Sequence, residues 1–249
     1  MILVVNAENR RLFAADLADM HRQRKIVFVD RAGWTVPVIG DREIDAYDRE
    51  DTLYLLAKAR VDGPLLASLR LLTTTGPHLM CDLFDAADRK KMPRGETVWE
   101  ASRFCTSPDI RGPRRRHALL WEIICGILEA GLVYGIDEVI FAAGHALLPL
   151  ALQCGWDART LGPAVRDGQD EVTAAGATIT AAGLRTVRER HDIRIPVTRI
   201  HAAEPPPVRD RIERRSPEAI DSPFTVPEHD PRPRSEPPNR PSRGESRHG

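Results

Sequence analysis

The sequence predicts an α/β fold in which helices cover both faces of one mixed sheet. Strand-like segments come first and then alternate with helical ones, and one long helix has a continuous apolar face. The 249 residues, 42% of them apolar, suffice for one large domain or two small ones. Residues 201–249 hold 11 of the 20 prolines and show no periodicity. We expect one domain over residues 1–200 and a Pro/Arg-rich, disordered tail over 201–249, whose prolines are alternatively a ligand for a partner.

The first helix is expected to begin near Asn9, a capping residue, and to continue through apolar positions at spacings of three and four as far as Phe28. Gly33 stops it. Residues 34–51 lack periodicity, which predicts a long loop of the kind that often carries function. Three strand-like segments follow, and the first two should form an antiparallel hairpin: residues 53–61, 65–73 and 97–104.

The longest predicted element is a helix that Pro113 opens and Gly135 ends, with an apolar face that includes Ile123 and Ile127. Shorter segments follow it: a strand over 137–143, a helix over 145–154, strands over 172–180 and 193–198, and between these two strands a helix over 184–191.

Composition excludes several classes of function. The 36 Lys+Arg balance 36 Asp+Glu, so no net field holds the whole protein on nucleic acid or on an anionic membrane. No apolar run approaches the roughly 18 residues of a membrane span, and no basic segment precedes the first apolar stretch, so we expect a cytoplasmic protein without membrane or nucleic-acid partners. The four cysteines lack metal-ligand spacing, and no G-x-G-x-x-G or P-loop occurs, so neither a metal nor a dinucleotide site is indicated.

The predicted loop is strongly acidic. From Asp41 to Asp51 it carries six acids and two arginines, a local charge of minus four. A cationic ligand would be attracted there, and a solvated loop is the alternative. Arg24, Phe28 and Trp34 lie upstream, and a cation held between carboxylates and an aromatic face gains about 0.5–2 kcal/mol. Plain core packing is the alternative for the two aromatic residues.

Four arginines gather at the start of the long helix: Arg111, Arg114, Arg115 and Arg116. Cations at a helix N-terminus oppose the macrodipole by about 0.3–1 kcal/mol each. Together with the free helix amides they would receive a phosphate or an acidic protein surface. The chain contains many arginines and only four lysines, so a compositional bias is the alternative explanation.

Alternation along the third predicted strand assigns side chains to its two faces. Glu100, Ser102 and Phe104 share one face, and Trp99 and Arg103 share the other. A carboxylate and a hydroxyl on one face of a strand within a cleft can serve a proton transfer. If the side chains at positions 100 and 103 both face the cleft, a bulge must interrupt the strand.

Several segments form a specific combination of motifs: MHRQRKIVF at Met20–Phe28, Trp34, EIDAYD at Glu43–Asp48, ASLRLLTTTGPHLM at Ala67–Met80, Phe84, WEASRF at Trp99–Phe104, Gly155, Trp156, Leu161 and Gly162. Over about residues 1–200 this combination resembles the acyl-homoserine-lactone synthases of quorum sensing, the LuxI-type autoinducer synthases. The resemblance implies a GNAT-like three-layer α/β/α sandwich with a mixed, mainly antiparallel central sheet, which agrees with the order of elements.

The resemblance also implies a reaction. Such enzymes join an acyl chain carried on acyl carrier protein to S-adenosylmethionine, and they then close the lactone. The products are an N-acyl-L-homoserine lactone, 5'-methylthioadenosine and the free carrier. S-adenosylmethionine is a substrate here, so no cofactor is implied.

Site roles follow by the same resemblance. Glu100 is the candidate general base, accompanied by Ser102 and Arg103 in the catalytic set. The side that binds S-adenosylmethionine combines arginines that order the acidic loop with aromatic and acidic residues that suit a sulfonium: Arg24, Phe28, Trp34, Asp45, Asp48 and Arg70. The channel for pantetheine or acyl chain is expected along Ser102, Phe104, Ala142 and Ala143.

The chain departs from the family pattern in two places. The helix after the sixth strand carries Leu147, Leu148, Pro149 and Leu150 where members usually have basic residues, which shifts carrier docking to the cluster Arg111, Arg114, Arg115 and Arg116. Ala142 and Ala143 replace the Thr or Ser frequent near the acyl pocket, which favours a medium or long chain and disfavours a 3-oxo group.

Two rival functions compete with lactone synthesis: one is that of another enzyme, and the second belongs to another class. An ordinary GNAT acetyltransferase needs a glycine-rich turn after the strand that carries Glu100, whereas residues 111–116 contain one glycine and a proline without an amide donor. An acyl-CoA donor within the synthase family stays open. A non-catalytic binding module is the second rival, and the full set of charged motif residues argues against it.

Overall fold

The computed structural model describes residues 1–167 and 170–201. Its strands are β1 (Ile2–Val5), β2 (Val38–Ile39), β3 (Arg42–Glu43), β4 (Leu53–Lys58), β5 (Leu65–Thr73), β6 (Val98–Thr106), β7 (Glu138–Gly144), β8 (Asp157–Asp167), β9 (Asp170–Thr178) and β10 (Thr198–Ile200). Its helices are α1 (Ala14–Arg24), the π-helix η1 (Lys25–Arg31), α2 (Met80–Leu83), α3 (Ala86–Arg89), α4 (Pro113–Tyr134), α5 (Leu148–Gln153) and α6 (Ala181–Arg190).

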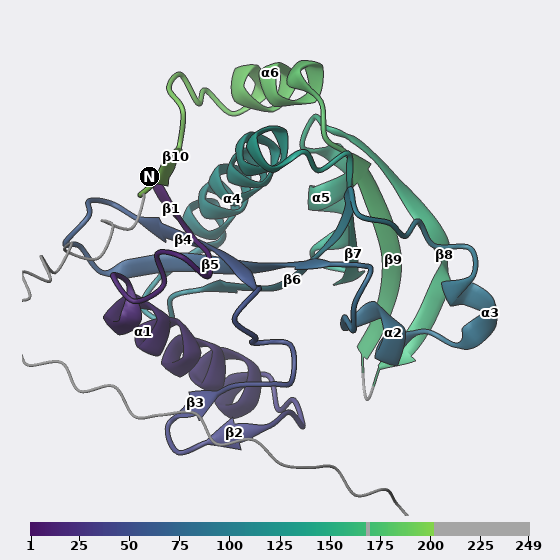
Figure 1. Ribbon diagram of the computed structural model, residues 1–249, viewed down its shortest axis with the longest axis horizontal. Coiled ribbons are helices and arrows are strands. Elements are labelled where there is room, and N and C mark those ends of the chain that lie inside the picture. The colour runs from purple at the N-terminus through teal and green to yellow at the C-terminus, as the bar shows by residue number, and fades with distance from the viewer. Residues whose placement is uncertain (168–169, 202–249) are drawn as a thin grey trace, which may run out of the picture. The chain divides into compact units, whose positions relative to one another are not determined.

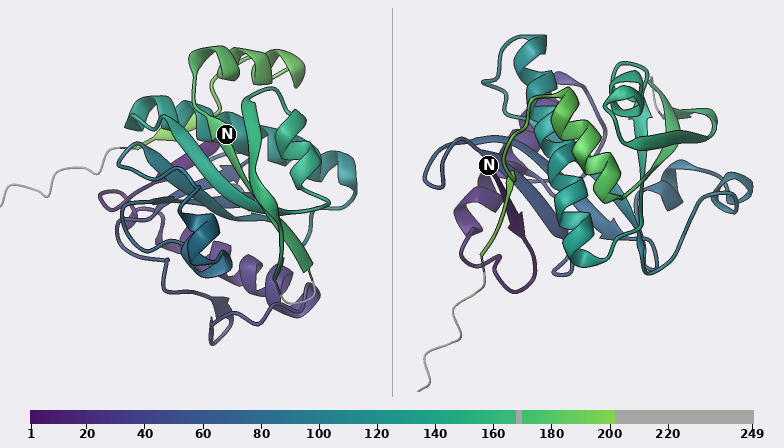
Figure 2. Two further views of the ribbon diagram at one scale, coloured as in Figure 1. Left: turned by 90° about the vertical axis from the view of Figure 1, so that its right-hand side faces the viewer. Right: turned by 90° about the horizontal axis from the view of Figure 1, so that it is seen from above.

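One sheet of eight strands organises the domain, in the order β10-β1-β4-β5-β6-β7-β9-β8. β10 and β7 pair in parallel with β1 and β6, and the other neighbours are antiparallel, including the predicted β4–β5 hairpin. Helices α4 and α6 cover one face, and α1 covers the other (Figures 1 and 2). The predicted three-layer sandwich with a mixed, mainly antiparallel sheet is confirmed.

The main core lies between the sheet and α4, where Ile123 and Ile127 join a large cluster of buried apolar residues. Gly135 ends this helix as predicted, because it adopts the left-handed conformation, with φ of 69°, that glycine tolerates best. The helix is long and apolar enough to cross a membrane, which was not expected, but 61% of that stretch is buried within the protein. Its apolar face is therefore that of a core helix.

A smaller core lies on the opposite face of the sheet. Phe13, Leu17 and Met20 of the α1 segment pack there against the strands. The predicted first helix continues past α1 into η1, whose π-helical turns end at Arg31, two residues before Gly33 adopts φ of 73°. This face also carries the charged residues of the acidic loop.

A β-bulge interrupts β6. Ser68 pairs with Cys105 and Arg70 with Ser102, so β6 has one residue more than β5 over this stretch. Arg103 takes up the extra residue with a positive φ of 55°. The predicted alternation is therefore wrong beyond Ser102: Arg103 joins the face of Glu100 and Ser102, and Phe104 packs against the main core.

Other expectations differ at the ends of elements or in number. β1 and β8 were not predicted, and the final strand lies at 198–200 rather than 193–198. The predicted loop over 34–51 contains the short β2–β3 hairpin. Apart from His201, the predicted tail lies outside the described residues.

Candidate active site

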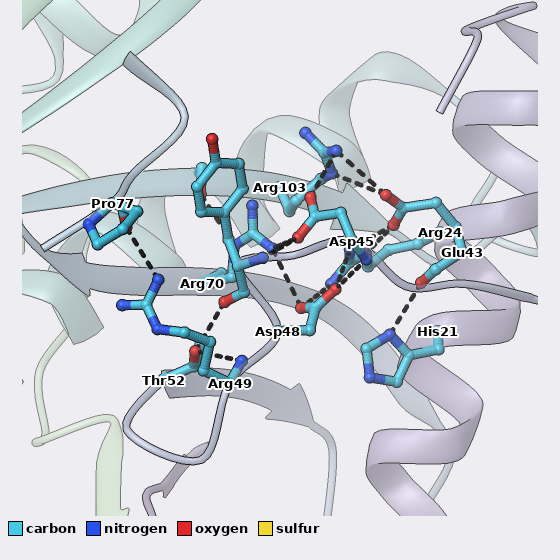
Figure 3. A network of polar contacts seen from close by, with 12 residues as sticks. His21, Arg24, Glu43, Asp45, Asp48, Arg49, Thr52, Arg70, Pro77 and Arg103 are labelled. Carbon is cyan, nitrogen blue, oxygen red and sulfur yellow. Dashed lines mark hydrogen bonds and ion pairs between the residues drawn. The ribbon is translucent and has the colours of Figure 1, made fainter. Parts of the chain in front are cut away.

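A buried network of six charged side chains connects α1, the acidic loop and the two central strands β5 and β6 (Figure 3). Three arginines come from three different elements: Arg24, Arg70 and Arg103. Three carboxylates come from β3 and the loop that follows it: Glu43, Asp45 and Asp48. Five of the six are among the site residues predicted from the sequence. The sixth, Glu43, bridges two arginines and was predicted only as part of the EIDAYD motif.

Asp48 lies at the centre of the network. Arg24 donates to both of its oxygens, at 2.8 and 2.9 Å, in the bidentate geometry that suits guanidinium and carboxylate. The Tyr54 hydroxyl adds a third contact at 2.9 Å. Burial alone would raise the pKa of Asp48, but the hydrogen bonds and charge of Arg24, with the charge of Arg70, hold it well below its usual range. This aspartate is ionised at every physiological pH.

The other two arginines close the network around Asp45. Arg70 donates to Asp45 at 2.5 Å and to Asp48 at 3.1 Å, while Arg103 donates to Asp45 at 2.8 Å and to Glu43 at 3.1 Å. Three positive and three negative groups therefore cancel. Asp45 and Asp48 are thus neutralised by arginines, although the loop as a whole carries a charge of minus four. The number of acids in the loop therefore does not measure the negative charge that a ligand would meet at these two residues. Their contact with a cationic substrate stays a prediction.

An aromatic pair borders the network. The rings of Phe28 and Trp34 stack with centroids 4.7 Å apart and planes within 8° of each other. The guanidinium of Arg103 lies 5.9 Å from each ring centroid. Phe28 is buried, but 40% of Trp34 is exposed, so core packing does not account for the indole. The stack leaves an aromatic surface open beside the charged residues.

Glu100 lies two residues before Ser102 on β6, on the same face of the strand as Ser102 and Arg103. One of its oxygens, Oε2, accepts a hydrogen bond of 2.7 Å from the Met80 amide, and the buried Oε1 has no partner within the described chain. Burial raises the pKa of Glu100, and the Met80 amide, then His78 and Arg70, oppose the rise. A carboxylate with a raised pKa and a free oxygen is suited to accept a proton.

A second unpartnered polar atom belongs to Arg70. Its Nη2 is buried and has no acceptor among the described residues, while Nε donates to the Ser102 hydroxyl at 3.1 Å. Arg70 is paired with Ser102 and Leu72 with Glu100, so Arg70 and Glu100 are diagonal neighbours on adjacent strands. A free donor thus lies near a free acceptor, an arrangement that fits the carboxylate and amine of an α-amino acid.

Comparison with known proteins identifies the family. The sequence pattern of the autoinducer synthases matches residues 8–185, most of the described domain. The chain belongs to the autoinducer synthase family. The acyl-homoserine-lactone synthase of Agrobacterium fabrum is 30% identical over 186 residues, which cover 73% of this chain and 84% of that one. Enzymes of this kind are acyltransferases.

Solved structures agree with this assignment. A CoA-dependent acyl-homoserine lactone synthase, BjaI, solved with SAM and isopentyl-CoA, superposes with a TM-score of 0.73 at 27% identity, covering 82% of this chain and 94% of that one. A protein named an N-acetyltransferase, from Lactobacillus plantarum, gives a TM-score of 0.50 at 18% identity over 72% of this chain and 99% of its own. The second likeness concerns the fold alone.

The predicted channel residues of this synthase divide between the two faces of the sheet. Ser102 contacts Arg70, and Ala142 packs with the small apolar cluster of Met80, on the face of the network. Phe104 and Ala143 belong to the core beneath α4, on the other face. β6 and β7 pair only from Val98 to Glu100, so they separate where these four residues begin. A channel lined by all four has to pass between the separated strands.

The arginine cluster lies at the start of α4, as expected from the sequence. Arg111, Arg114, Arg115 and Arg116 are exposed around the first turn of α4, and within residues 1–167 and 170–201 none of them has an ion-pair partner. Gly112, the N-cap, provides no side-chain cap for the helix amides. The cluster is thus open to an anionic group, which leaves its role as a docking surface to be tested.

Sequence reasoning missed residues that act through their backbone or through distant partners. The Met80 amide and the hydroxyls of Tyr47 and Tyr54 all contact members of the site or their neighbours. Alternation in β4 was the one available signal, since it places Tyr54 on the face opposite the main core. Nothing in the local sequence indicates that the Met80 amide reaches Glu100.

Proposed function

We propose that this synthase makes an N-acyl-L-homoserine lactone from S-adenosylmethionine and an acyl chain carried as a thioester on acyl carrier protein. The observation that carries the proposal is a pair of buried atoms, Glu100 Oε1 and Arg70 Nη2, that have no hydrogen-bond partner among the described residues. Arg70 belongs to the network whose Arg103 lies against the stacked rings of Phe28 and Trp34. One atom suits the amine of S-adenosylmethionine, the other suits its carboxylate, and the aromatic surface suits the adenine or the sulfonium. No cofactor takes part, and the reaction is cytoplasmic.

The first step is acyl transfer. Glu100, directly or through a water molecule, removes a proton from the ammonium group, and the neutral amine attacks the thioester carbonyl. Backbone amides where β6 and β7 separate stabilise the oxyanion. When the tetrahedral intermediate collapses, the new C–N amide bond stays and the C–S bond breaks. The thiolate of the carrier leaves with the electron pair and takes up the proton that the attacking nitrogen loses.

The second step is lactone closure. The carboxylate, positioned by Arg70, attacks the carbon that bears the sulfonium, forming a C–O bond within one molecule. The C–S bond breaks, and 5'-methylthioadenosine leaves with the electron pair that neutralises its sulfur. No proton is needed for this step, so the network has only to hold the substrate in a folded conformation.

The acyl donor distinguishes two versions of the function. The exposed arginines at the start of α4 fit the acidic surface of a carrier protein, and this is the version we favour. The CoA dependence named for BjaI supports acyl-CoA as the second candidate, since the same arginines fit its phosphates. The small side chains of Ala142 and Ala143 support a medium or long acyl chain without a 3-oxo group.

The test is lactone synthesis by the purified full-length chain. S-adenosylmethionine is supplied with matched acyl chains on carrier protein or on CoA, and lactone and 5'-methylthioadenosine are measured by mass spectrometry. We expect both products, with a higher kcat/KM for the carrier-bound chain. Glu100→Gln keeps the size of the side chain and removes the base, so it should abolish lactone formation while the fold is retained. Turnover near that of the wild type in this variant removes Glu100 from the mechanism.

A further inference from the structure

The acidic loop contacts a second segment that lies over Glu100. Tyr47 donates its hydroxyl hydrogen to Asp82 of α2. Arg49 donates to the carbonyl oxygen of Pro77 at 2.9 Å (Figure 3). Between these two anchors lies Met80, whose amide donates to Glu100 at 2.7 Å. The backbone that hydrogen-bonds the carboxylate of Glu100 is therefore fixed at both ends by the loop that follows β3.

Tyr47 also contacts the other end of the amino-acid site. The guanidinium of Arg70 lies 5.6 Å from the centroid of its ring. The side chain of Tyr47 thus extends from Arg70, whose Nη2 has no acceptor among the described residues, to α2, whose Met80 amide donates to Glu100. Contacts of this kind couple the position of the proton acceptor to the position of the carboxylate donor.

We propose that Tyr47 is a positioning residue for Glu100: through Asp82 its hydroxyl holds α2, and so keeps the Met80 amide on the Glu100 carboxylate. The role deepens the proposed function, because it rests on Glu100 as the base of acyl transfer. Tyr47 itself transfers no proton. Burial and its bond to Asp82 raise its pKa, so the phenol stays protonated at neutral pH.

The sign of the expected effect follows from the groups around Glu100. An amide that donates to a carboxylate favours the ionised form and lowers its pKa. The other charged or titratable groups that face Glu100 are His78, Arg70 and Tyr47. Arg70 is held by Asp45 and Asp48, independently of the hydroxyl of Tyr47. His78 contacts Cys81 of α2 and moves with the loosened segment, and because His78 lowers the pKa of Glu100, its displacement acts in the same direction as loss of the amide bond. Loosening α2 weakens the amide bond, so the pKa of Glu100 rises further and a higher pH is needed to ionise it.

The experiment is a carboxyl titration by carbon-13 NMR on the full chain, with the Glu100 resonance assigned as the one that Glu100→Gln lacks. Tyr47→Phe should raise the pKa of Glu100 by about 0.5–1 unit. This shift corresponds to losing part of the free energy with which the Met80 amide stabilises the ionised carboxylate. The acidic limb of kcat/KM should move by the same amount, and turnover should recover at higher pH. An unchanged Glu100 midpoint in Tyr47→Phe refutes the positioning role.

Matched variants separate this role from a general loss of stability. Tyr134→Phe also removes a partly buried hydrogen bond, the one that the Asn6 side chain donates to the Tyr134 hydroxyl at 3.2 Å. This variant should leave the Glu100 midpoint unchanged. Asp82→Asn and Asp82→Ala remove the same charge, but only asparagine keeps an oxygen that accepts from Tyr47. A higher midpoint in Asp82→Ala than in Asp82→Asn supports the proposal, and equal midpoints overturn it. If the wild type makes no lactone, the proposed function fails, while the titration still decides the role of Tyr47.

Discussion

Replacing Asp48 by asparagine removes one negative charge from the buried network without changing the shape of the side chain. Arg24, which bonds to both oxygens of Asp48, and Arg70 then hold an uncompensated positive charge away from water. Breaking a buried pair in this way costs about 3–5 kcal/mol, a large part of the roughly 5–15 kcal/mol that stabilises a typical domain. We expect the free energy of unfolding of Asp48→Asn to fall by that amount.

Urea unfolding at pH 7 measures this free energy, with Asp19→Asn as the control. Asp19 pairs with Arg22 on the surface, where both side chains are about half exposed, so its loss should cost less than about 1 kcal/mol. Equal losses in the two variants would refute the view that burial makes the network sensitive to a missing charge.

The pH dependence gives a second check on the same variant. The pKa of Asp48 in the folded chain lies below its value in the unfolded chain, so its contribution is complete above the unfolded pKa of about 4 and is lost as pH falls toward the folded pKa. The gap in stability between the wild type and Asp48→Asn should therefore be constant between pH 7 and pH 5 and should narrow in acid. A gap that widens in acid contradicts this assignment.

Two further predictions concern the surface and the C-terminal part of the domain. Charge reversal at Arg115 and Arg116 should raise KM for acyl carrier protein and weaken its dependence on salt, with kcat unchanged; Arg185→Glu on α6 is the control, and an effect of equal size there would contradict specific docking. A chain that ends after His201 should retain lactone synthesis. A chain that ends before Val197 should have a lower unfolding temperature, because buried Glu129 loses hydrogen bonds of 3.0 Å from the Val197 amide and 2.8 Å from the Thr198 amide. Equal stability of the two truncated chains, measured by thermal unfolding, would show that these bonds contribute nothing.

The elements that periodicity predicted well are those buried on a continuous face. β5 lies at residues 65–73 as expected, and α4 begins at Pro113 and ends before Gly135, since apolar side chains line the faces that they bury. β8 was missed because it pairs with β9 alone and most of its side chains are exposed or half-buried, which leaves no apolar alternation to read. Hydrophobic periodicity arises where one face of an element is buried, so an edge strand with few buried side chains is hard to predict from the sequence.

The site divides in a similar way. Residue types and motifs were enough to name the arginines and aspartates of the network, but not to pair them, because the partners lie as far apart as Arg103 and Glu43. A count of charges along the loop therefore indicated a cation site, whereas folding brings arginines to the same carboxylates. The contact between the Met80 amide and Glu100 involves no side chain at position 80 and leaves no trace in the residue type.

The bulge in β6 has a consequence for how substitutions in this strand are interpreted. Alternation counted forward from Val98 assigns faces correctly as far as Ser102, and alternation counted backward from Thr106 does so as far as Arg103. The two counts differ by one at Arg103, so neither describes the whole strand. A deletion of one residue here would restore a regular ladder and, by the same shift, turn the guanidinium of Arg103 away from Glu43 and Asp45. Regularity in this strand is incompatible with the network.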